Sequence, residues 1–337
     1  GHSFRNVLPA FQYAPIDLAA VCDLDIERAE VYARQFGAER AYSDYREMLE
    51  KEELDAAFIV TSYDAEGEPQ SWSIAADAVS AGVHVWTEKP QTGRPERVEE
   101  LMRLCERSGK WVMVGYKKIF FPAIAKAKEI MARSDFGAFT SMYCRYPQAL
   151  PPMEERPNGR RMIGFLDHIV HPMSIVYYLG GPIRSLRFLR EPRRGATVTL
   201  IRFVNGGIGT LHLTAGQSGT SPLERVEVIG EGANLVVDNG VHLTYYRPGS
   251  RGTYGRSTSF IVDDDQAPLV WTPEFSLGQL YNKNLFTLGY AQEILYFAEC
   301  VLENRPPERA GLAMALEMAK VFQAYLAPDG EEVVINP

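Results

Sequence analysis

The sequence predicts an α/β protein, in which an N-terminal doubly wound parallel sheet is followed by an α+β domain with a large open, mainly antiparallel sheet. Up to about residue 118, buried strand patterns alternate with amphipathic helical patterns, as in parallel strands joined by crossover helices. Beyond that point, strand patterns follow one another with turn signals between them, which favours antiparallel pairing. We therefore expect two domains, residues 1–118 and 119–337.

The first half of the chain repeats one unit, a strand followed by a helix. Short apolar runs predict the strands, and helical spacing with a terminal glycine predicts the helices. Asp44 and Glu47 have capping-box spacing, so a helix is expected to begin at DYREMLE. The other expected elements are strand 18–22, helix 26–37, strand 56–60, helix 73–82, strand 83–87, helix 98–109 and strand 111–115.

The second half contains strand patterns separated by turn signals such as NGG and DNG. We expect these strands to form one open sheet, and two long helices to close the chain. The expected elements are helix 123–132, strands 139–146, 185–191, 196–204, 207–214, 225–232 and 233–238, and helices 290–304 and 311–326.

The composition excludes several classes of partner. A formal net charge of -8 leaves no basic stripe to neutralise phosphates, so no nucleic-acid partner is expected. The 4 cysteines lie far apart without CxxC spacing, which suggests neither a zinc site nor a disulfide framework. No apolar run is long enough to cross a bilayer, and no signal-peptide pattern is present. A cytoplasmic location and no membrane partner are therefore expected.

The start of the chain resembles the end of a dinucleotide-binding loop. Such folds usually open with a buried strand and a GxGxxG loop, whose glycines let a pyrophosphate approach the next helix. The chain begins at Gly1 with GHSFRNVLPAF, which we interpret as the end of that loop and its helix. The first strand is central in this topology, and without it neighbouring strands would be unpaired. We therefore expect the natural protein to be longer at its N-terminus.

Cofactor contacts are expected where the parallel strands end, because ligands of doubly wound sheets bind beyond the carboxyl ends of the strands. Asp23 follows one strand, and its carboxylate would accept hydrogen bonds from ribose hydroxyls and repel a 2′-phosphate. The next residue is Leu24 rather than arginine, so NAD is favoured over NADP; a solvated turn aspartate is the alternative for Asp23. The expected cofactor-binding residues are Gly1, Asp23, Thr61, Glu88, Lys89 and Tyr116.

The segment Thr87-Glu88-Lys89-Pro90 follows a strand where the nicotinamide end of the cofactor would lie, and a cis Lys-Pro bond would turn the lysine inward. AGVHVWTEKP, VMVGYKKIFFPA and the downstream Asp167-x-x-x-His171 resemble the glucose-fructose oxidoreductase, inositol dehydrogenase and rhizopine-catabolism family, over essentially the whole chain. The resemblance implies a Rossmann domain and an α+β domain. It also implies hydride transfer at a hydroxyl of a sugar, polyol or inositol-like ring, and a homodimer or homotetramer formed through the open sheet.

The stretch FLDHIVHP carries the expected acid-base chemistry. Asp167 and His171 are four residues apart, which places them on one face of a helix. Oxidation of a carbinol needs a base for the hydroxyl proton, and histidine suits that task, so His171 is the expected base; a core histidine is the alternative. The resemblance implies the same role for His171, substrate contact for Asp167, and a hydrogen bond from Lys89 to the reacting oxygen.

The sequence departs from the family pattern around these residues. Ser174 stands where the family helix has a second aspartate, Ile169 where it has glycine, and Lys117 where asparagine is common. These changes leave the acid-base set intact and alter the surface that would bind substrate hydroxyls. The expected substrate-binding residues are Lys89, Tyr146, Arg161, Asp167, His171 and Ser174, and an arginine at 160 or 161 would suit a carboxylate or phosphate or else be a solvated loop residue.

Three other interpretations compete with a sugar or polyol dehydrogenase. A metal site on Asp167, His168 and His171 is disfavoured because adjacent helical residues point about 100° apart. The same fold can use tightly bound NAD as a recycling oxidant in redox-neutral glycoside cleavage through a keto sugar. A non-enzymatic dinucleotide-sensing regulator would have no use for Lys89 with Asp167 and His171, so an enzyme is favoured and no metal is expected.

Overall fold

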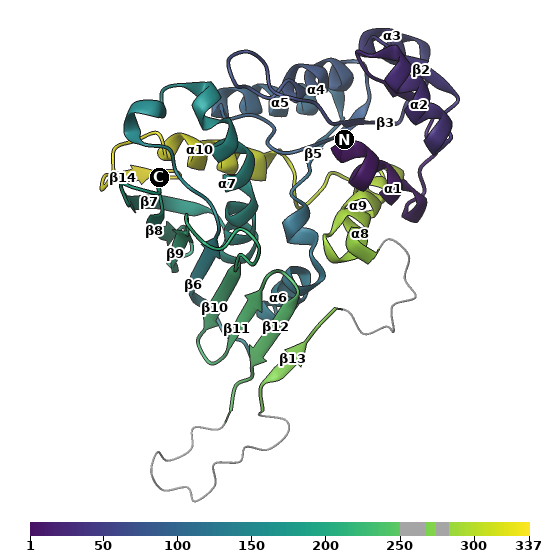
Figure 1. Cartoon of the computed structure of the whole chain (residues 1–337). Helices are drawn as coiled ribbons and strands as arrows, with labels where there is room; N and C mark the ends of the chain where they lie inside the picture. The colour runs from purple at the N-terminus through teal and green to yellow at the C-terminus, as the bar shows by residue number, and fades with distance from the viewer. Residues whose placement is uncertain (250–266, 274–282) are drawn as a thin grey trace, which may run out of the picture. The chain divides into compact units, whose positions relative to one another are not determined.

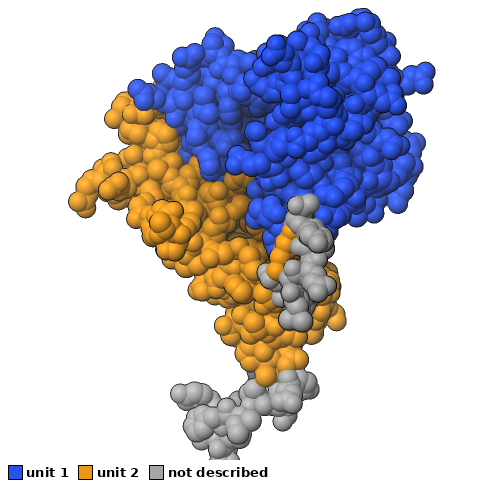
Figure 2. All heavy atoms as spheres, turned by 45° about the vertical axis from the view of Figure 1, so that its right-hand side comes forward, with its two compact units in different colours: residues 1–117, 158–170, 284–323 blue, residues 118–157, 171–283, 324–337 orange. Residues whose placement is uncertain are grey.

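The computed structural model describes residues 1–249, 267–273 and 283–337. These residues form two compact units (Figures 1 and 2). The first unit contains residues 1–117, 158–170 and 284–323, and the second contains the remaining described residues. The expected division at residue 118 stays a prediction, and two later segments of the expected second domain, residues 158–170 and 284–323, cluster with the first unit. One reason is that the helix at Tyr290–Leu302 packs against the N-terminal helical segment.

The first unit is built mainly from parallel strands and helices. A helical segment comes first, as the reading of GHSFRNVLPAF expects, and it includes η1 (Ser3–Val7), α1 (Leu8–Ala10) and η2 (Phe11–Tyr13). The elements up to residue 117 are β1 (Ala20–Cys22), α2 (Ile26–Phe36), β2 (Arg40–Tyr42), α3 (Tyr45–Lys51), β3 (Ala56–Ile59), α4 (Ser71–Ser80), β4 (His84–Thr87), α5 (Pro95–Ser108) and β5 (Val112–Val114). The later helices of the chain are α8 (Lys283–Thr287), α9 (Tyr290–Leu302) and α10 (Leu312–Ala324).

The parallel sheet of this unit is in two pieces. β1 pairs with β2 in parallel, and β3, β4 and β5 form a second parallel group in that order. The β4 strand is the centre of its group and all of its residues are buried. Its neighbours Ile59 and Val114 are also buried, so the core of the unit lies around β4.

The second unit is built on a large sheet. Within the described residues its order is β13-β12-β11-β10-β6-β9-β8-β7-β14, antiparallel except between β6 and β9. Its strands are β6 (Phe139–Tyr146), β7 (Ile183–Arg190), β8 (Thr197–Phe203), β9 (Ile208–Leu213), β10 (Arg225–Gly230), β11 (Asn234–Asp238), β12 (His242–Tyr246), β13 (Leu269–Trp271) and β14 (Glu332–Val334). The shorter helical elements are η3 (Lys117–Phe120), α6 (Pro122–Met131) and η4 (Met153–Glu155), and the long α7 (Gly159–Gly180) runs from the first unit into the second.

The alternation of buried and exposed residues explains the sheet's two faces. In β8 the side chains of Thr197, Thr199, Ile201 and Phe203 are buried, and the residues between them are exposed. A strand presents alternate side chains to opposite faces, so one face of the sheet forms a core. The helix α6 packs against β11 and β12 on this unit (Figure 1). The predicted fold class, a doubly wound parallel domain with a mainly antiparallel α+β domain, is therefore confirmed.

Several predicted elements have the expected start and end. Gly37 ends α2 with a left-handed φ of 82°, a conformation that glycine adopts without steric cost. Asp44 is the N-cap of α3 and accepts a hydrogen bond from the Arg46 amide, whereas Glu47 pairs with Lys51 instead of closing a capping box. The sequence analysis missed β2, β12, β13 and β14, which are short strands at or near a sheet edge. In the described part of the chain, no helix is long and apolar enough to span a membrane.

Candidate active site

Lys89 lies two residues after the end of β4, at the carboxyl end of the parallel sheet. The amide of Glu88 donates to the carbonyl of Ile59 at 2.9 Å, so the chain stays attached to β3 for one residue beyond the strand. The Lys89–Pro90 peptide bond is cis, as the sequence suggested. The Lys89 side chain is 13% exposed, which leaves its ammonium largely shielded from water.

The ammonium of Lys89 is paired with Asp167 of α7. Lys89 Nζ donates to Asp167 Oδ1 at 2.9 Å and to the Asp167 carbonyl at 3.2 Å. Burial acts to raise the pKa of Asp167, but the Lys89 charge, its hydrogen bond and a hydrogen bond from Tyr63 outweigh burial and lower the pKa. Asp167 is therefore an ionised carboxylate beside a cation at neutral pH. The structure thus brings together two residues that the sequence analysis selected from positions 78 apart.

Tyr63 is a third member of this cluster that the sequence analysis missed. Its hydroxyl donates to Asp167 Oδ1 at 2.9 Å. Burial raises the pKa of Tyr63, and the Asp167 carboxylate raises it further, so the hydroxyl keeps its proton and stays a donor. Tyr63 follows β3 just beyond Thr61, and its place after a strand end was the signal that could have found it.

Glu88 connects the same strand end to the start of the chain. His2 Nε2 lies 2.7 Å from Glu88 Oε1, and the Lys89 amide donates to Glu88 Oε2 at 3.1 Å. Gly1 immediately precedes this histidine, and its nitrogen lies 3.4 Å from the Tyr32 hydroxyl. Glu88 therefore contacts the residue that follows Gly1.

Asp23 follows β1 and is half-buried. Its carboxylate accepts the Asp25 amide at 3.0 Å, and Arg28 Nη1 lies 3.5 Å from its other oxygen. The next residue, Leu24, is exposed. The cation near the Asp23 carboxylate is Arg28, in the first turn of α2, which the sequence analysis did not consider. Asp23 keeps acceptor capacity beyond these two contacts, because an ionised carboxylate accepts about four hydrogen bonds.

Thr61 and Tyr116 follow β3 and β5. Thr61 is exposed. Tyr116 is 1% exposed, and burial raises the pKa of its hydroxyl. Its ring is therefore part of the buried core.

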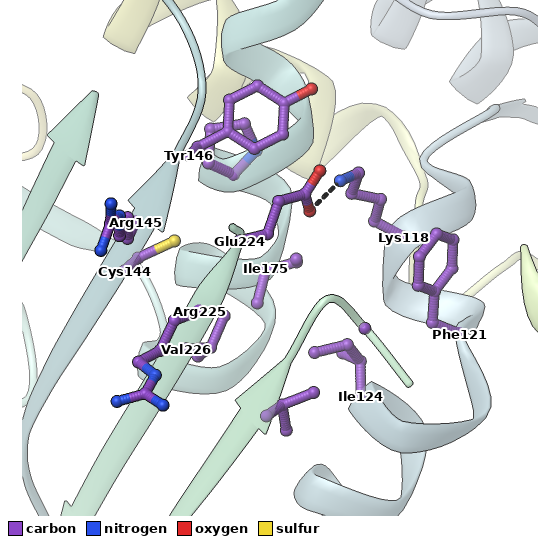
Figure 3. Close-up of a pocket in the computed structure, with 13 residues that line it drawn as sticks. Lys118, Phe121, Ile124, Cys144, Arg145, Tyr146, Ile175, Glu224, Arg225 and Val226 are labelled. Atoms are coloured by element: carbon purple, nitrogen blue, oxygen red, sulfur yellow. Dashed lines mark hydrogen bonds and ion pairs between the residues drawn. The ribbon is translucent and has the colours of Figure 1, made fainter. Parts of the chain in front are cut away.

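In the second unit, His171 lies beside Tyr146. The two ring centroids are 6.3 Å apart, and His171 is half-buried on α7. Lys118, which is 7% exposed, forms a hydrogen-bonded ion pair with Glu224, and its ammonium lies 4.7 Å from the centre of the Tyr146 ring. Figure 3 shows the ion pair with Tyr146 beside a cavity of about 10 Å³, enough for about one water molecule. Lys118 was not selected by the sequence analysis.

The remaining predicted residues of α7 have other contacts. Ser174 is completely buried, and its hydroxyl donates to the His171 carbonyl at 2.9 Å, so the structure gives it a helix-backbone partner. Arg161 is exposed in the first turn, where its amide donates to the Asn158 carbonyl at 3.0 Å. His168 Nδ1 lies 3.0 Å from the Gly164 carbonyl, which requires a proton on that nitrogen. Across the described residues, no three His, Cys, Asp or Glu side chains group in a way that could hold a metal ion.

Chemically, the first-unit cluster is a shielded cation beside an ionised carboxylate. A fixed ammonium with little access to water stabilises negative charge on a nearby oxygen more strongly than it would in solution. The carboxylate and the tyrosine hydroxyl hold that ammonium in place. Such an arrangement suits a reaction in which a hydroxyl oxygen becomes more negative.

Comparison with known proteins indicates an oxidoreductase. Residues 1–116 match the model of the oxidoreductase family with an NAD-binding Rossmann fold. This match covers the first 116 of the chain's 337 residues. The recognised resemblance, the oxidoreductase class and the NAD-binding fold are confirmed.

Two curated relatives of this oxidoreductase illustrate the range of the family. The chain is 27% identical over 296 residues to a scyllo-inositol 2-dehydrogenase (NAD(+)) of Bacillus subtilis, covering 83% of this chain and 77% of that protein. It is 30% identical over 151 residues to D-xylose 1-dehydrogenase (NADP(+)) 2 of Haloferax volcanii, and spans 45% of each chain. Among solved structures, levoglucosan dehydrogenase in complex with NADH and levoglucosan has a TM-score of 0.76 at 19% identity, covering 96% of this chain and 94% of that one. At that identity the match shows a shared fold.

Proposed function

We propose that this oxidoreductase is an NAD-dependent dehydrogenase that transfers a hydride between a hydroxyl-bearing carbon of a sugar, polyol or inositol-like substrate and the nicotinamide. The observation that carries the proposal is the Lys89–Asp167 pair at the carboxyl end of β4, with Nζ and Oδ1 2.9 Å apart. Ligands of this fold bind beyond the strand ends, so the pair lies where a reacting hydroxyl would be placed. The named dehydrogenases among its relatives support the same class of reaction.

Lys89 would hydrogen-bond the reacting oxygen and stabilise the alkoxide that develops as hydride leaves the carbon. Asp167 would hold the lysine and balance its charge, and it retains acceptor capacity for a neighbouring substrate hydroxyl. Tyr63 would fix the carboxylate by donating to the same oxygen. His171, four residues after Asp167 on α7, would accept the hydroxyl proton as general base.

One observation supports the proposed NAD contacts. Asp23 follows β1 with an ionisable carboxylate beyond the strand end, the place of the ribose-binding acid in this fold. When bound, NAD supplies the hydride acceptor. Gly1, Thr61, Glu88, Lys89 and Tyr116 are the other proposed contacts, and Tyr146, Arg161 and Ser174 are proposed to shape the substrate side.

The experiment that tests this function is a screen of polyols, aldoses, uronates and inositols for NADH formation. A dehydrogenase should form NADH with at least one class in proportion to substrate consumed. Tight retention of NAD with substrate cleavage and no net NADH would instead identify the redox-neutral glycoside-cleaving reaction. Saturable NAD binding with no turnover of any hydroxyl compound would identify a regulator.

We also propose that the protein forms a homodimer or homotetramer through the outer face of its large sheet. Leu189 of β7 is directly opposite Val198 of β8, and these residues are 64% and 44% exposed. Leu200 and Ile208 on the same face are 59% and 56% exposed. A neighbouring copy would bury this apolar patch. Leu200→Asp should then lower the mass measured by analytical ultracentrifugation.

A cytoplasmic location is proposed on the state of the cysteines. Cys22, Cys105, Cys144 and Cys300 are all unpaired thiols. Free thiols persist where glutathione and thioredoxin keep the compartment reducing. The net charge of -8 supports a small-molecule substrate and no nucleic-acid partner.

A further inference from the structure

A long loop connects β3 to α4 in the first unit. It occupies residues 60–70, whereas a loop between a parallel strand and the next helix usually has about 2–6 residues. Residues 62–70 of this connection are here called the clasp loop. Long loops that are ordered by their own contacts are commonly functional, so the contacts of this loop indicate what it does.

Hydrogen bonds within the clasp loop give it a fixed shape. The amide of Asp64 donates to the Glu68 carbonyl at 2.8 Å. The amide of Gln70 donates to the Ser62 carbonyl at 3.1 Å. Asp64 Oδ1 also accepts the amides of Glu66 and Glu68, both at 2.9 Å. The loop is therefore held as one unit, so a contact at one of its residues restrains the others.

The clasp loop contacts the first turn of α7 through two glycines. Gly67 has a left-handed φ of 88°, and a Cβ there would lie 2.6 Å from the Gly159 carbonyl carbon. A Cβ on Gly159 would overlap the Glu66 carbonyl oxygen. Arg160 Nε also donates to the Ala65 carbonyl. Glycine has no Cβ, and this allows the backbones of the loop and the helix to approach so closely.

The clasp loop also contacts the segment that follows Lys89. Glu68 Oε1 accepts a hydrogen bond from Arg94 Nε at 3.1 Å, and Oε2 accepts one from the Thr92 hydroxyl at 3.0 Å. The Glu68 side chain is 14% exposed, so these bonds are largely shielded from water. The loop is therefore bonded both to the segment that carries Lys89 and to the helix that carries Asp167.

Tyr63, near the start of the clasp loop, holds one oxygen of the Asp167 carboxylate. Its hydroxyl and Lys89 Nζ each donate to Oδ1 at 2.9 Å. Oδ2 lies 3.5 Å from His168 Nδ1, and that nitrogen is 3.0 Å from the Gly164 carbonyl, which takes its proton. Oδ2 therefore keeps acceptor capacity for a substrate hydroxyl.

We propose that the clasp loop positions the Lys89–Asp167 pair: through Tyr63 it keeps Oδ1 on the lysine and leaves Oδ2 for a substrate hydroxyl. Gly67 and Gly159 are positioning residues, because they bring the loop against the helix that carries the carboxylate. This inference rests on the proposed dehydrogenase function. A displacement of about 1 Å can cost roughly 100-fold in rate, so a small shift of the loop should have a measurable effect.

Gly159→Ala tests the attachment of the loop, and Gly164→Ala is the matched control. Both glycines belong to α7, and a Cβ on Gly164 would meet nothing within 4 Å. Hydrogen–deuterium exchange followed by mass spectrometry should show exchange in residues 62–70 on the order of tenfold faster in Gly159→Ala and unchanged in Gly164→Ala. Unchanged exchange in Gly159→Ala, or equal acceleration in both variants, would overturn the proposal.

The ¹³C signal of the Asp167 carboxyl carbon, assigned by its loss in Asp167→Asn, reports the hydrogen bond from Tyr63 without turnover. Tyr63→Phe and Gly159→Ala should shift this signal in the same direction at pH 7, and Gly164→Ala should not shift it. Gly159→Ala should cause no further shift in the Tyr63→Phe background, because the bond it breaks is already gone. Additive shifts would contradict an action through Tyr63.

Turnover of the substrate found in the screen completes the test. Tyr63→Phe and Gly159→Ala should each lose on the order of 10- to 100-fold in kcat/KM, and the double variant should lose no more than Tyr63→Phe alone. Gly164→Ala should stay within about twofold of the wild type. Wild-type kcat/KM in Gly159→Ala with a displaced loop would overturn the positioning role.

The exchange and ¹³C measurements need neither NAD nor substrate. If both effects were found in a chain that oxidises no hydroxyl compound, the proposed dehydrogenase function would fail, and the hold of the clasp loop on Asp167 would still be supported. If the dehydrogenase is active and Gly159→Ala leaves the Asp167 signal unmoved, the positioning role fails alone.

Discussion

Lys89 Nζ and Asp167 Oδ1 lie 2.9 Å apart, and this ion pair joins the end of β4 to α7. The two side chains are 13% and 29% exposed, so water screens the pair only in part. The pair therefore has two consequences that separate experiments can measure, one for the stability of the fold and one for the chemistry of the site.

The Lys89→Met variant should lose more free energy of unfolding than the double variant that carries Lys89→Met and Asp167→Asn. The single change leaves a shielded carboxylate without its cation, which costs about 2–4 kcal/mol, whereas the double change removes both charges. Urea unfolding of the wild type and the three variants at pH 7 gives the coupling energy. Additive losses in the two single variants would show that the pair contributes nothing to folding.

For the cofactor, Asp23→Ala should weaken NAD binding by about 10- to 100-fold, because two ribose hydroxyls lose a charged acceptor. The same change should improve the relative affinity for NADP, since the repelling charge is gone and Arg28 stays in place. Calorimetric titration with both dinucleotides measures the two effects. Arg28→Ala is the matched control, and it should leave NAD affinity within a fewfold of the wild type.

For pH, His84 should make the protein less stable in mild acid. Burial and the nearby Lys110 lower the pKa of His84 from 6.5 to about 4. Between these two pH values the unfolded chain therefore takes up a proton that the folded chain does not. The contribution of His84 to the free energy of unfolding is complete above pH 6.5 and is lost as pH falls from 6.5 towards 4. The expected loss is on the order of 2 kcal/mol.

His84→Asn should flatten that slope. The asparagine oxygen would replace Nδ1, which accepts the Trp111 amide at 3.3 Å, without a group that titrates in this range. Denaturant unfolding from pH 4.5 to pH 7.5 compares the two proteins. If the variant showed the wild-type slope, the acid sensitivity would belong to other groups.

In the second unit, Glu224→Gln should destabilise the protein by about 2–4 kcal/mol, because it leaves the buried Lys118 ammonium without its counter-ion. Adding Lys118→Met should recover most of that loss, since the apolar side chain can pack against the ring of Tyr146. Thermal unfolding of the single and double variants measures the recovery. A double variant as unstable as Glu224→Gln would contradict a role for the ion pair.

Strands with an alternating pattern were predictable from the sequence, and β6 occupies Phe139–Tyr146 as expected. The short strands were not, because pairs such as β2 with β1 depend on tertiary contacts more than on local pattern. The site shows the same limit. Lys89 and Asp167 carry local motifs, whereas Tyr63 and Lys118 gain their contacts from residues 104 and 106 positions away.

The most direct test of the central claim is the turnover of Lys89→Ala and His171→Ala with NAD and the best substrate found in the screen. Each variant should lose at least about 100-fold in kcat, because each removes a group that acts on the reacting hydroxyl, and the NAD affinity of His171→Ala should change little. Full turnover by either variant, with wild-type NAD binding, would contradict the assignment of these residues to the acid-base step.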